Sequence, residues 1–228
     1  MRHAARWRVL SLVESTVSAA LLAVLLFGVA GTTGWNGAWV WLALLVAASV
    51  VLSLVLDPRI LRERVSAPAR RRLRAWDAVW ATAMGVSFFG WLVLMALDAG
   101  RFGWTAPPAW ARVVGAVVVV AVYVASYFAL QANVFASPIV DIQRDTHQTV
   151  VSTGPYGIVR HPLYAAVIWA WPATALVLGS VVGLALSPVL IALVVVRTVL
   201  EDRTLAIELD GYREYRARVR YRLIPRVW

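Results

Sequence analysis

The sequence of 228 residues lacks two residue types altogether, cysteine and lysine, and it contains little histidine. The absence of cysteine excludes disulfides, a thiol nucleophile and thiolate ligands for a metal. The three histidines, His3, His147 and His161, are too few for a zinc site without cysteine partners. We therefore expect no bound metal.

Every basic residue is an arginine, and 22 arginines against 12 acidic residues give a net charge of +10. Such an excess is typical of nucleic-acid-binding proteins, but it is also found in the cytoplasmic loops of membrane proteins. The chain is 61% hydrophobic and has a mean hydropathy of +0.73, which favours the membrane interpretation. The bilayer is thus the expected partner, and nucleic acid is not.

Apolar runs long enough to cross a bilayer occupy most of the chain. Four of them lie at residues 10–30, 38–56, 78–97 and 112–130. The last stretch, residues 163–196, is apolar over 34 residues, and one helix of that length would measure about 51 Å against a hydrocarbon core of roughly 30 Å. We therefore predict a C-terminal helical hairpin here, and an all-α, polytopic transmembrane fold with about six spans.

The segment LGSVVG, residues 178–183, is the predicted turn of this hairpin, because glycine and serine favour turns. Pro188 is expected to begin the return helix, since proline suits the first helical turn. Pro172 then lies inside the outgoing helix and is expected to kink it, which membrane helices tolerate.

The arginines are distributed unevenly over the connecting segments. Twenty of the 22 belong to the N-terminal arm, residues 57–77, residues 131–162 and the tail from Arg197. Only Arg101 and Arg112 belong to the other face of a six-span protein. The positive-inside rule therefore predicts that both termini and the charged segments are cytoplasmic. The first run, although preceded by a basic arm, is predicted to be a retained span and not a cleaved signal peptide.

Two motifs flank the predicted hairpin: HQTVVSTGPYGIVRHPLYAA at residues 147–166 and RTVLEDRTLAIELDGYREYRARVRYRLIP at residues 197–225. They resemble the isoprenylcysteine carboxyl methyltransferase family, which is grouped with the phospholipid methyltransferases. The resemblance is specific over about residues 141–225, and DPRILRERV, residues 57–65, is similar to a loop of bacterial members. It implies a C-terminal methyltransferase core at residues 131–228, behind an N-terminal four-helix transmembrane region at residues 1–130.

The resemblance also implies S-adenosylmethionine as cofactor, bound by cytoplasmic segments without a Rossmann domain. The sequence fits this, because no G-x-G-x-x-G motif follows a predicted strand. A composition in which arginine replaces lysine is typical of a GC-rich bacterial genome, so the inner membrane of a bacterium is the expected location. Since protein prenylation is not expected in most bacteria, we expect a membrane lipid or a small amphipathic molecule as the methyl acceptor.

The residues themselves suggest how the cofactor is bound. Residues 154–157, Gly-Pro-Tyr-Gly, are typical of a turn, and Pro162 suits the first position of a helix. A helix that begins near His161 leaves unpaired N–H groups, which suit the carboxylate of S-adenosylmethionine. A capped helix that merely enters the membrane would show the same pattern.

By resemblance, ten residues are expected to bind the cofactor: His147, Val150, Gly154, Tyr156, Val159, Arg160, His161, Pro162, Tyr164 and Glu208. Aromatic faces such as those of Tyr156 and Tyr164 attract a sulfonium cation, although tyrosines also form belts at membrane interfaces. His161 is expected to contact the cofactor and not to act as a base. As alternatives, Arg160 reaches a lipid phosphate and His147 is an ordinary loop residue.

Arg197 and Glu201 are the predicted catalytic residues. They lie one helical turn apart at the end of the last span, where an acid is costly unless it is paired or functional. Glu201 matches the first acid of the family pattern E-E/D-x-x-L, and Asp202 matches the second. A carboxylate acceptor would need no base and would be oriented by Arg197, whereas an amine or thiol would need Glu201 as base. The alternative is a surface ion pair.

Arg197 is also expected to bind the substrate, together with Tyr212 and Tyr215 of an amphipathic segment on the membrane surface. The sequence thus predicts an integral-membrane, S-adenosylmethionine-dependent methyltransferase. Two other functions remain open: an NADPH-dependent membrane reductase of the sterol-reductase type, and a small non-catalytic transporter. The transporter is disfavoured because the spans hold few ionisable groups at mid-depth and show no clear inverted repeat.

Overall fold

The computed structural model describes residues 2–70, 74–140, 142 and 148–228, and every regular element among them is a helix. In chain order these are α1 (Arg2–Ala30), α2 (Asn36–Val55), α3 (Pro58–Arg70), α4 (Ala75–Met95), the π-helical η1 (Ala96–Phe102), α5 (Ala109–Ala132), the short 3₁₀ helix η3 (Gly154–Gly157), α6 (Pro162–Leu178), α7 (Val181–Glu208) and α8 (Tyr212–Arg218). The all-α prediction is confirmed.

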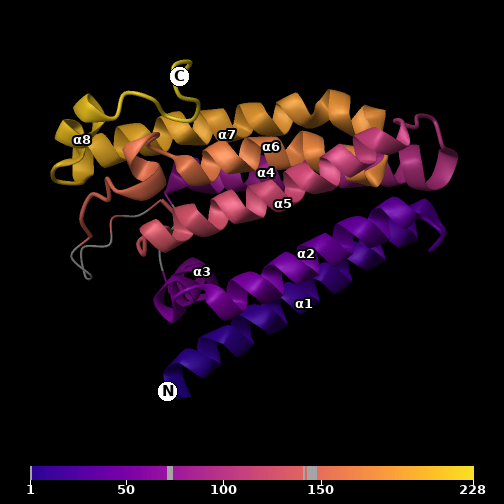
Figure 1. Cartoon of the computed structure of the whole chain (residues 1–228), viewed down its shortest axis with the longest axis horizontal. Coiled ribbons are helices and arrows are strands. Elements are labelled where there is room, and N and C mark those ends of the chain that lie inside the picture. Colours follow the sequence, from indigo (N-terminus) through magenta and orange to yellow (C-terminus); the bar gives the residue numbers. More distant parts are fainter. Residues whose placement is uncertain (1, 71–73, 141, 143–147) are drawn as a thin grey trace.

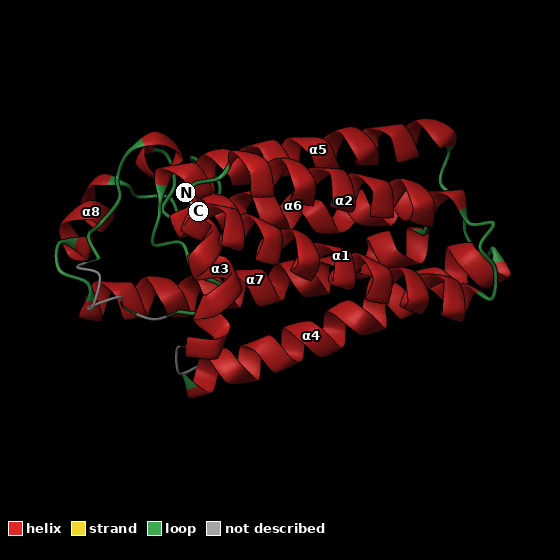
Figure 2. Cartoon of the chain, turned by 90° about the horizontal axis from the view of Figure 1, so that it is seen from below, coloured by secondary structure: helices red, strands yellow, loops and turns green. Residues whose placement is uncertain are grey.

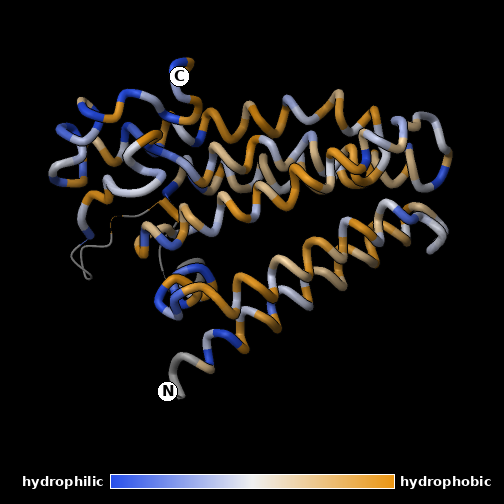
Figure 3. Tube along the Cα trace, viewed as in Figure 1, coloured by the Kyte–Doolittle hydropathy of each residue, from blue (hydrophilic) through white to orange (hydrophobic). Residues whose placement is uncertain are grey.

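Five helical stretches are long and apolar enough to cross a membrane, and they comprise α1, α2, α4 with η1, α5 and α7. The sixth apolar helix, α6, is shorter, with 17 residues. Apolar residues lie along the length of the long helices, whereas polar residues gather at the two ends of the bundle (Figure 3). The chain is an integral membrane protein, and all six predicted apolar segments are helical.

The helices form two groups that lie side by side (Figure 1). Helices α1 and α2 make one antiparallel pair, and α5, α6 and α7 pack with α4 in the other group. Glycine allows the closest approach between α5 and α6, because a Cβ atom on Gly115 would lie 2.8 Å from the carbonyl oxygen of Ala173. Small residues have this role in membrane helices generally, since they let two backbones come together.

The predicted hairpin is present, but its return helix begins earlier than expected. Helix α7 starts at Val181, and Pro188 lies inside it. The turn needs only Gly179, which has a positive φ of 83°, and Ser180, whose side chain accepts the backbone N–H of Gly183 and caps α7. A serine cap supplies the helix start that we assigned to proline.

Both termini lie toward the same end of the bundle, which requires an even number of crossings (Figures 1 and 2). We call this the site end; its described residues are 57–70, 133–140, 148–161 and 209–228. The opposite end comprises residues 31–35, 97–108 and 179–180. The site end includes α3, which we had expected only as a charged connection. Its start follows a recognisable signal, because Asp57 accepts the backbone N–H of Arg59 at 2.7 Å and Pro58 occupies the first position.

Candidate active site

A cavity of about 110 Å³ opens at the site end, between the connecting segments and the last turns of α7. Its walls come from the loop after α5, the loop before η3, the start of α6, the end of α7 and α8. The lining residues are Asn133, Phe135, Ala136, Ser137, Ile139, Val140, Gln148, Thr149, Val150, Val151, Tyr156, Arg160, His161, Leu163, Tyr164, Glu201, Leu205, Leu209, Tyr212 and Tyr215. The cavity is smaller than the usual small-molecule site, which measures about 300–1,000 Å³.

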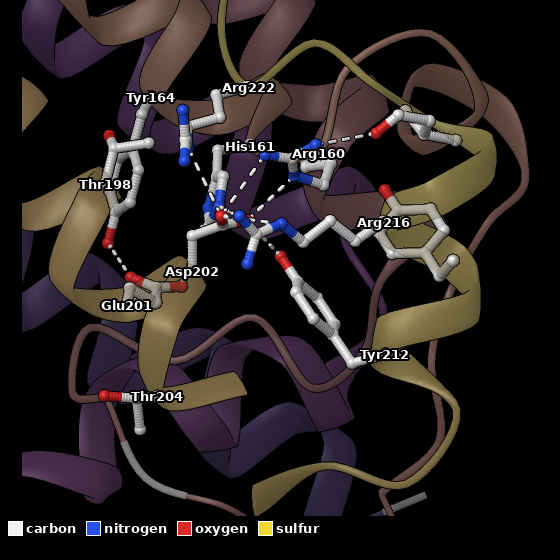
Figure 4. A network of polar contacts seen from close by, with 12 residues as sticks. Arg160, His161, Tyr164, Thr198, Glu201, Asp202, Thr204, Tyr212, Arg216 and Arg222 are labelled. Atoms are coloured by element: carbon white, nitrogen blue, oxygen red, sulfur yellow. Dashed lines mark hydrogen bonds and ion pairs between the residues drawn. The ribbon is translucent and has the colours of Figure 1, made fainter. Parts of the chain in front are cut away.

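Asp202 is the centre of the polar network beside this cavity (Figure 4). Its side chain is fully buried, and its two carboxylate oxygens accept N–H groups of Arg160 at 2.8 and 3.2 Å. Arg222 donates to it at 3.2 Å, and the hydroxyl of Tyr212 at 3.0 Å. The carboxylate, on α7, therefore connects this helix to the C-terminal tail and to the Arg160-His161-Pro162 sequence, which we call the RHP motif. The sequence marked Asp202 only as the second acid of a pair and gave no sign that it is the buried one.

Arg160 fastens the tail across the start of α6. Besides Asp202, its guanidinium donates to the carbonyl oxygens of Val219 and Arg220, both at 2.8 Å. The backbone N–H groups of Arg160 and His161 donate to the carbonyls of Tyr221 and Arg222. Arg160 is 5% exposed, so its role in this structure is internal and not a contact with lipid phosphate.

Glu201 lies at the cavity wall beside two aromatic rings. The hydroxyl of Tyr164 donates a hydrogen bond to Oε2 of Glu201 at 2.7 Å. The rings of His161 and Tyr164 stack, with 5.8 Å between their centres. His161 Nδ1 lies 3.9 Å from Glu201 Oε1. The other ring nitrogen, Nε2, is buried and makes no hydrogen bond with any described residue, although Asp202 Oδ1 is 3.5 Å away. A buried polar atom without a partner is unusual, and here it belongs to a residue that lines the cavity.

Arg197 lies behind Glu201 and Tyr164, toward α4, and is not part of the cavity wall. Its guanidinium is 4.1 Å from the ring centre of Trp80 and 5.9 Å from that of Tyr164. Its Nε is 4.0 Å from Glu201 Oε2, so the predicted pairing of the two side chains is loose. Arg197 contacts the lining loop through the backbone of that loop, because its Nη2 donates to the carbonyl of Pro138 at 2.6 Å.

The tyrosines of α8 close the cavity from the other side. The hydroxyl of Tyr215 donates to the carbonyl of Tyr156 at 2.8 Å, which ties α8 to η3. Burial raises the pKa of the Tyr156 hydroxyl to about 12 and that of Tyr215 above its usual range. The pKa of Tyr212 is also raised, first by burial and then by the neighbouring Asp202. These hydroxyls are therefore neutral donors at physiological pH.

The other predicted site residues are placed as follows. Helix α6 begins at Pro162 with His161 as its N-cap, as expected, and Val150 lines the cavity. Gly154, Val159 and Pro162 lie next to lining residues without forming the wall. Glu208 faces away and pairs with both terminal nitrogens of Arg74, at 2.7 and 2.8 Å. His147 lies outside the described residues. Sequence reasoning missed the lining loop at residues 133–140, which carries no motif.

With this geometry in place, two comparisons identify the class of the protein. A family model described as phospholipid methyltransferase matches residues 110–207, which include both the RHP motif and the acid pair. Among solved structures, the chain is similar to the eukaryotic intramembrane Ras methyltransferase ICMT (isoprenylcysteine carboxyl methyltransferase), with a TM-score of 0.55 and 15% identity over 93% of this chain and 75% of that one. A sequence search of curated proteins gives no match.

The fold and the matched segment define a membrane methyltransferase. The similarity agrees with the prediction from the two motifs: residues 110–207 match the phospholipid methyltransferase family, and the fold is similar to that of the isoprenylcysteine carboxyl methyltransferase structure. Within the part of the chain that the structure describes, no group of three or more histidine, cysteine and acidic side chains is arranged to hold a metal ion.

Proposed function

We propose that the chain transfers a methyl group from S-adenosylmethionine to a lipid-embedded or amphipathic acceptor, with the reaction taking place at the cytoplasmic surface of the membrane. The observation that supports this most directly is the cavity at the site end, where Glu201, Tyr164 and His161 meet. The family match favours this function over the reductase and the transporter, because the matched family is one of methyltransferases.

The residues around the cavity fit such a cofactor. The start of α6 offers backbone N–H groups to a carboxylate, because Pro162 opens the helix and His161 provides no side-chain cap. His161 Nε2 is a buried polar atom that still lacks a hydrogen bond to the described chain. Tyr156, Tyr212 and Tyr215 offer aromatic faces for a cation or an adenine ring.

When bound, S-adenosylmethionine supplies a methyl group activated by a sulfonium sulfur. Glu201 places a negative charge at the cavity wall, and Tyr164 holds one of its oxygens in a fixed position. Such a charge, oriented before the reaction, stabilises a positively charged reacting centre more than water does. Glu201 is also the group within reach of a proton leaving an amine or thiol acceptor.

Arg197 is suited to orient the acceptor beside the cavity. Its Nη2 is held by the carbonyl of Pro138 at 2.6 Å, and its Nε makes no hydrogen bond with the described residues. Nη2 therefore anchors the side chain, while the adjacent N–H of Nε has no partner among the described residues and is the group we assign to the acceptor. Trp80 of the membrane helix α4 packs on the guanidinium, which suits an acceptor that arrives from the bilayer along this helix.

Calorimetric titration of the purified protein tests the cofactor assignment, with S-adenosylmethionine and NADPH as separate ligands. We expect saturable binding of the first and none of the second. Radiolabelled S-adenosylmethionine then tests the acceptor, offered as phosphatidylethanolamine vesicles, as a farnesylated N-acetylcysteine and as a bacterial lipid extract. Binding of NADPH alone would contradict the proposal.

A further inference from the structure

Asp77, in the first turn of α4, is a buried acid that belongs to neither motif. Its side chain is 1% exposed although it comes from the N-terminal part of the chain, far from the methyltransferase core in sequence. Its Oδ2 accepts the backbone N–H of Val140 at 3.1 Å, in the loop that lines the cavity. Its Oδ1 lies 3.3 Å from Arg197 Nη2 and accepts no hydrogen bond of good geometry from the described residues.

Helix α4 holds the Arg197 guanidinium with two side chains. Trp80, one turn after Asp77, stacks on the guanidinium, whose central carbon lies 4.1 Å from the centre of the ring. The indole N–H of Trp80 donates to the carbonyl of Leu193 at 2.7 Å, which fixes the ring on α7. Arg197 is 6% exposed, so its charge depends on these neighbours and not on water.

The distances show which acid neutralises which base. Asp77 approaches Arg197 to 3.3 Å, whereas Glu201 approaches it only to 4.0 Å. Asp202 is matched by Arg160 at 2.8 Å. Glu201, whose side chain is 21% exposed, comes no closer than 4.0 Å to Arg197, and it accepts the neutral hydroxyl of Tyr164 at 2.7 Å.

We propose that Asp77 is a positioning residue for methyl transfer: it neutralises Arg197 and holds its guanidinium, so that the charge of Glu201 remains directed at the reacting centre. This inference rests on the proposed function. Without Asp77, Arg197 would turn to Glu201 as its remaining counter-ion. That movement would displace the group that orients the acceptor and weaken the negative charge at the cavity wall.

Asp77→Asn is the informative variant, because its amide oxygen can still accept the Val140 N–H while the charge beside Arg197 is lost. We expect S-adenosylmethionine affinity within about two-fold of wild type and turnover lowered by roughly 10- to 100-fold, as for a misplaced catalytic group. In an Arg197→Gln background, where the charge to be held is gone, Asp77→Asn should cause no further loss of turnover.

The matched control is Asp98→Asn, which removes a buried acid at the opposite end of the bundle, where Asp98 is fully buried. It should lower the thermal midpoint while leaving turnover per folded molecule unchanged. Turnover of Asp77→Asn within about two-fold of wild type, or losses that multiply in the double variant, would overturn the inference. Wild-type protein without cofactor binding or methylation of any of the three acceptors would instead refute the proposed function.

The double variant also decides the case in which Asp77→Asn does not fold. A single neutralised partner leaves a buried charge uncompensated, whereas removing both charges does not. Recovery of folded Asp77→Asn/Arg197→Gln beside an unfolded Asp77→Asn would support the pairing. Failure of both would show that neutralising Arg197 is not what the Asp77 charge contributes, and would overturn the inference.

Discussion

Each end of the bundle buries an aspartate completely, and the two aspartates have different partners. At the opposite end, Asp98 accepts the backbone N–H and hydroxyl of Thr105 at 2.9 and 2.6 Å and the hydroxyl of Ser180 at 2.5 Å. These donors are neutral, and they tie η1 and its following loop to the turn of the α6–α7 hairpin. At the site end, Asp202 is held by the arginines Arg160 and Arg222 and by Tyr212.

The two networks differ in kind: the one around Asp98 is a structural contact, whereas the one around Asp202 belongs to the candidate active site. Around Asp98, short neutral hydrogen bonds complete the network without any further ligand. At the site end, His161 Nε2, Arg197 Nε and Asp77 Oδ1 make no hydrogen bond with the described residues, although Asp77 Oδ1 and Arg197 Nη2 form an ion pair at 3.3 Å. Buried polar atoms normally find partners, so these unsatisfied atoms support the proposed ligand site at this end.

The largest effect is expected for Glu201→Gln, which keeps the shape of the side chain and removes its charge. Turnover should fall by about 100-fold or more, as when a group that stabilises the transition state is lost, while cofactor affinity changes several-fold at most. Initial rates with labelled cofactor and calorimetric titration measure the two effects. Glu214→Gln, an exposed acid in α8, is the control and should retain activity. A turnover near that of wild type would move the catalytic assignment away from α7.

The comparison of the two aspartates is sharpened by Asp202→Asn and Asp98→Asn. Removing the Asp202 charge leaves buried arginine without its counter-ion, at an expected cost of about 3–5 kcal/mol. Asp98→Asn loses an acceptor for neutral donors, at an expected cost of about 1–3 kcal/mol. Thermal midpoints in detergent should therefore fall further for Asp202→Asn. Proteolysis of the tail should increase only in that variant, and equal sensitivity in both would refute the distinction.

A smaller effect is expected for His161→Ala, which removes the unsatisfied Nε2 and the ring stacked on Tyr164. Cofactor affinity should weaken by about ten-fold, the equivalent of roughly 1.4 kcal/mol, while the protein remains folded. Calorimetry of the folded variant measures it. Unchanged affinity would remove His161 from the cofactor site.

The sequence predicted the helices well because membrane spans have a strong signal, long apolar runs of nearly fixed length. It also predicted that Arg160, His161, Tyr164 and Glu201 lie together, because the resemblance places the two motifs that flank the hairpin in one site. It did not predict Asp77, since a single acid at a helix start looks like ordinary helix-dipole compensation. Which of two adjacent acids is buried, Glu201 or Asp202, depends on the packing of the tail against α7, and no local pattern encodes it.

The smallest effect on activity is expected from single cysteine substitutions, which allow each end of the bundle to be labelled without a change in the site. The chain has no cysteine of its own, so Thr32→Cys and Arg62→Cys each introduce one reactive thiol. Both side chains are exposed, the first at the opposite end and the second on α3 at the site end. Because 20 of 22 arginines belong to segments assigned to one face, we expect a membrane-impermeant maleimide to label Thr32→Cys on intact cells, and Arg62→Cys only after permeabilisation. Activity of both variants should equal that of wild type. The proposed cofactor, S-adenosylmethionine, is a water-soluble metabolite of the cytoplasm. The reverse labelling pattern would therefore place the cavity where this molecule does not reach it, and would contradict both the orientation and the proposed reaction.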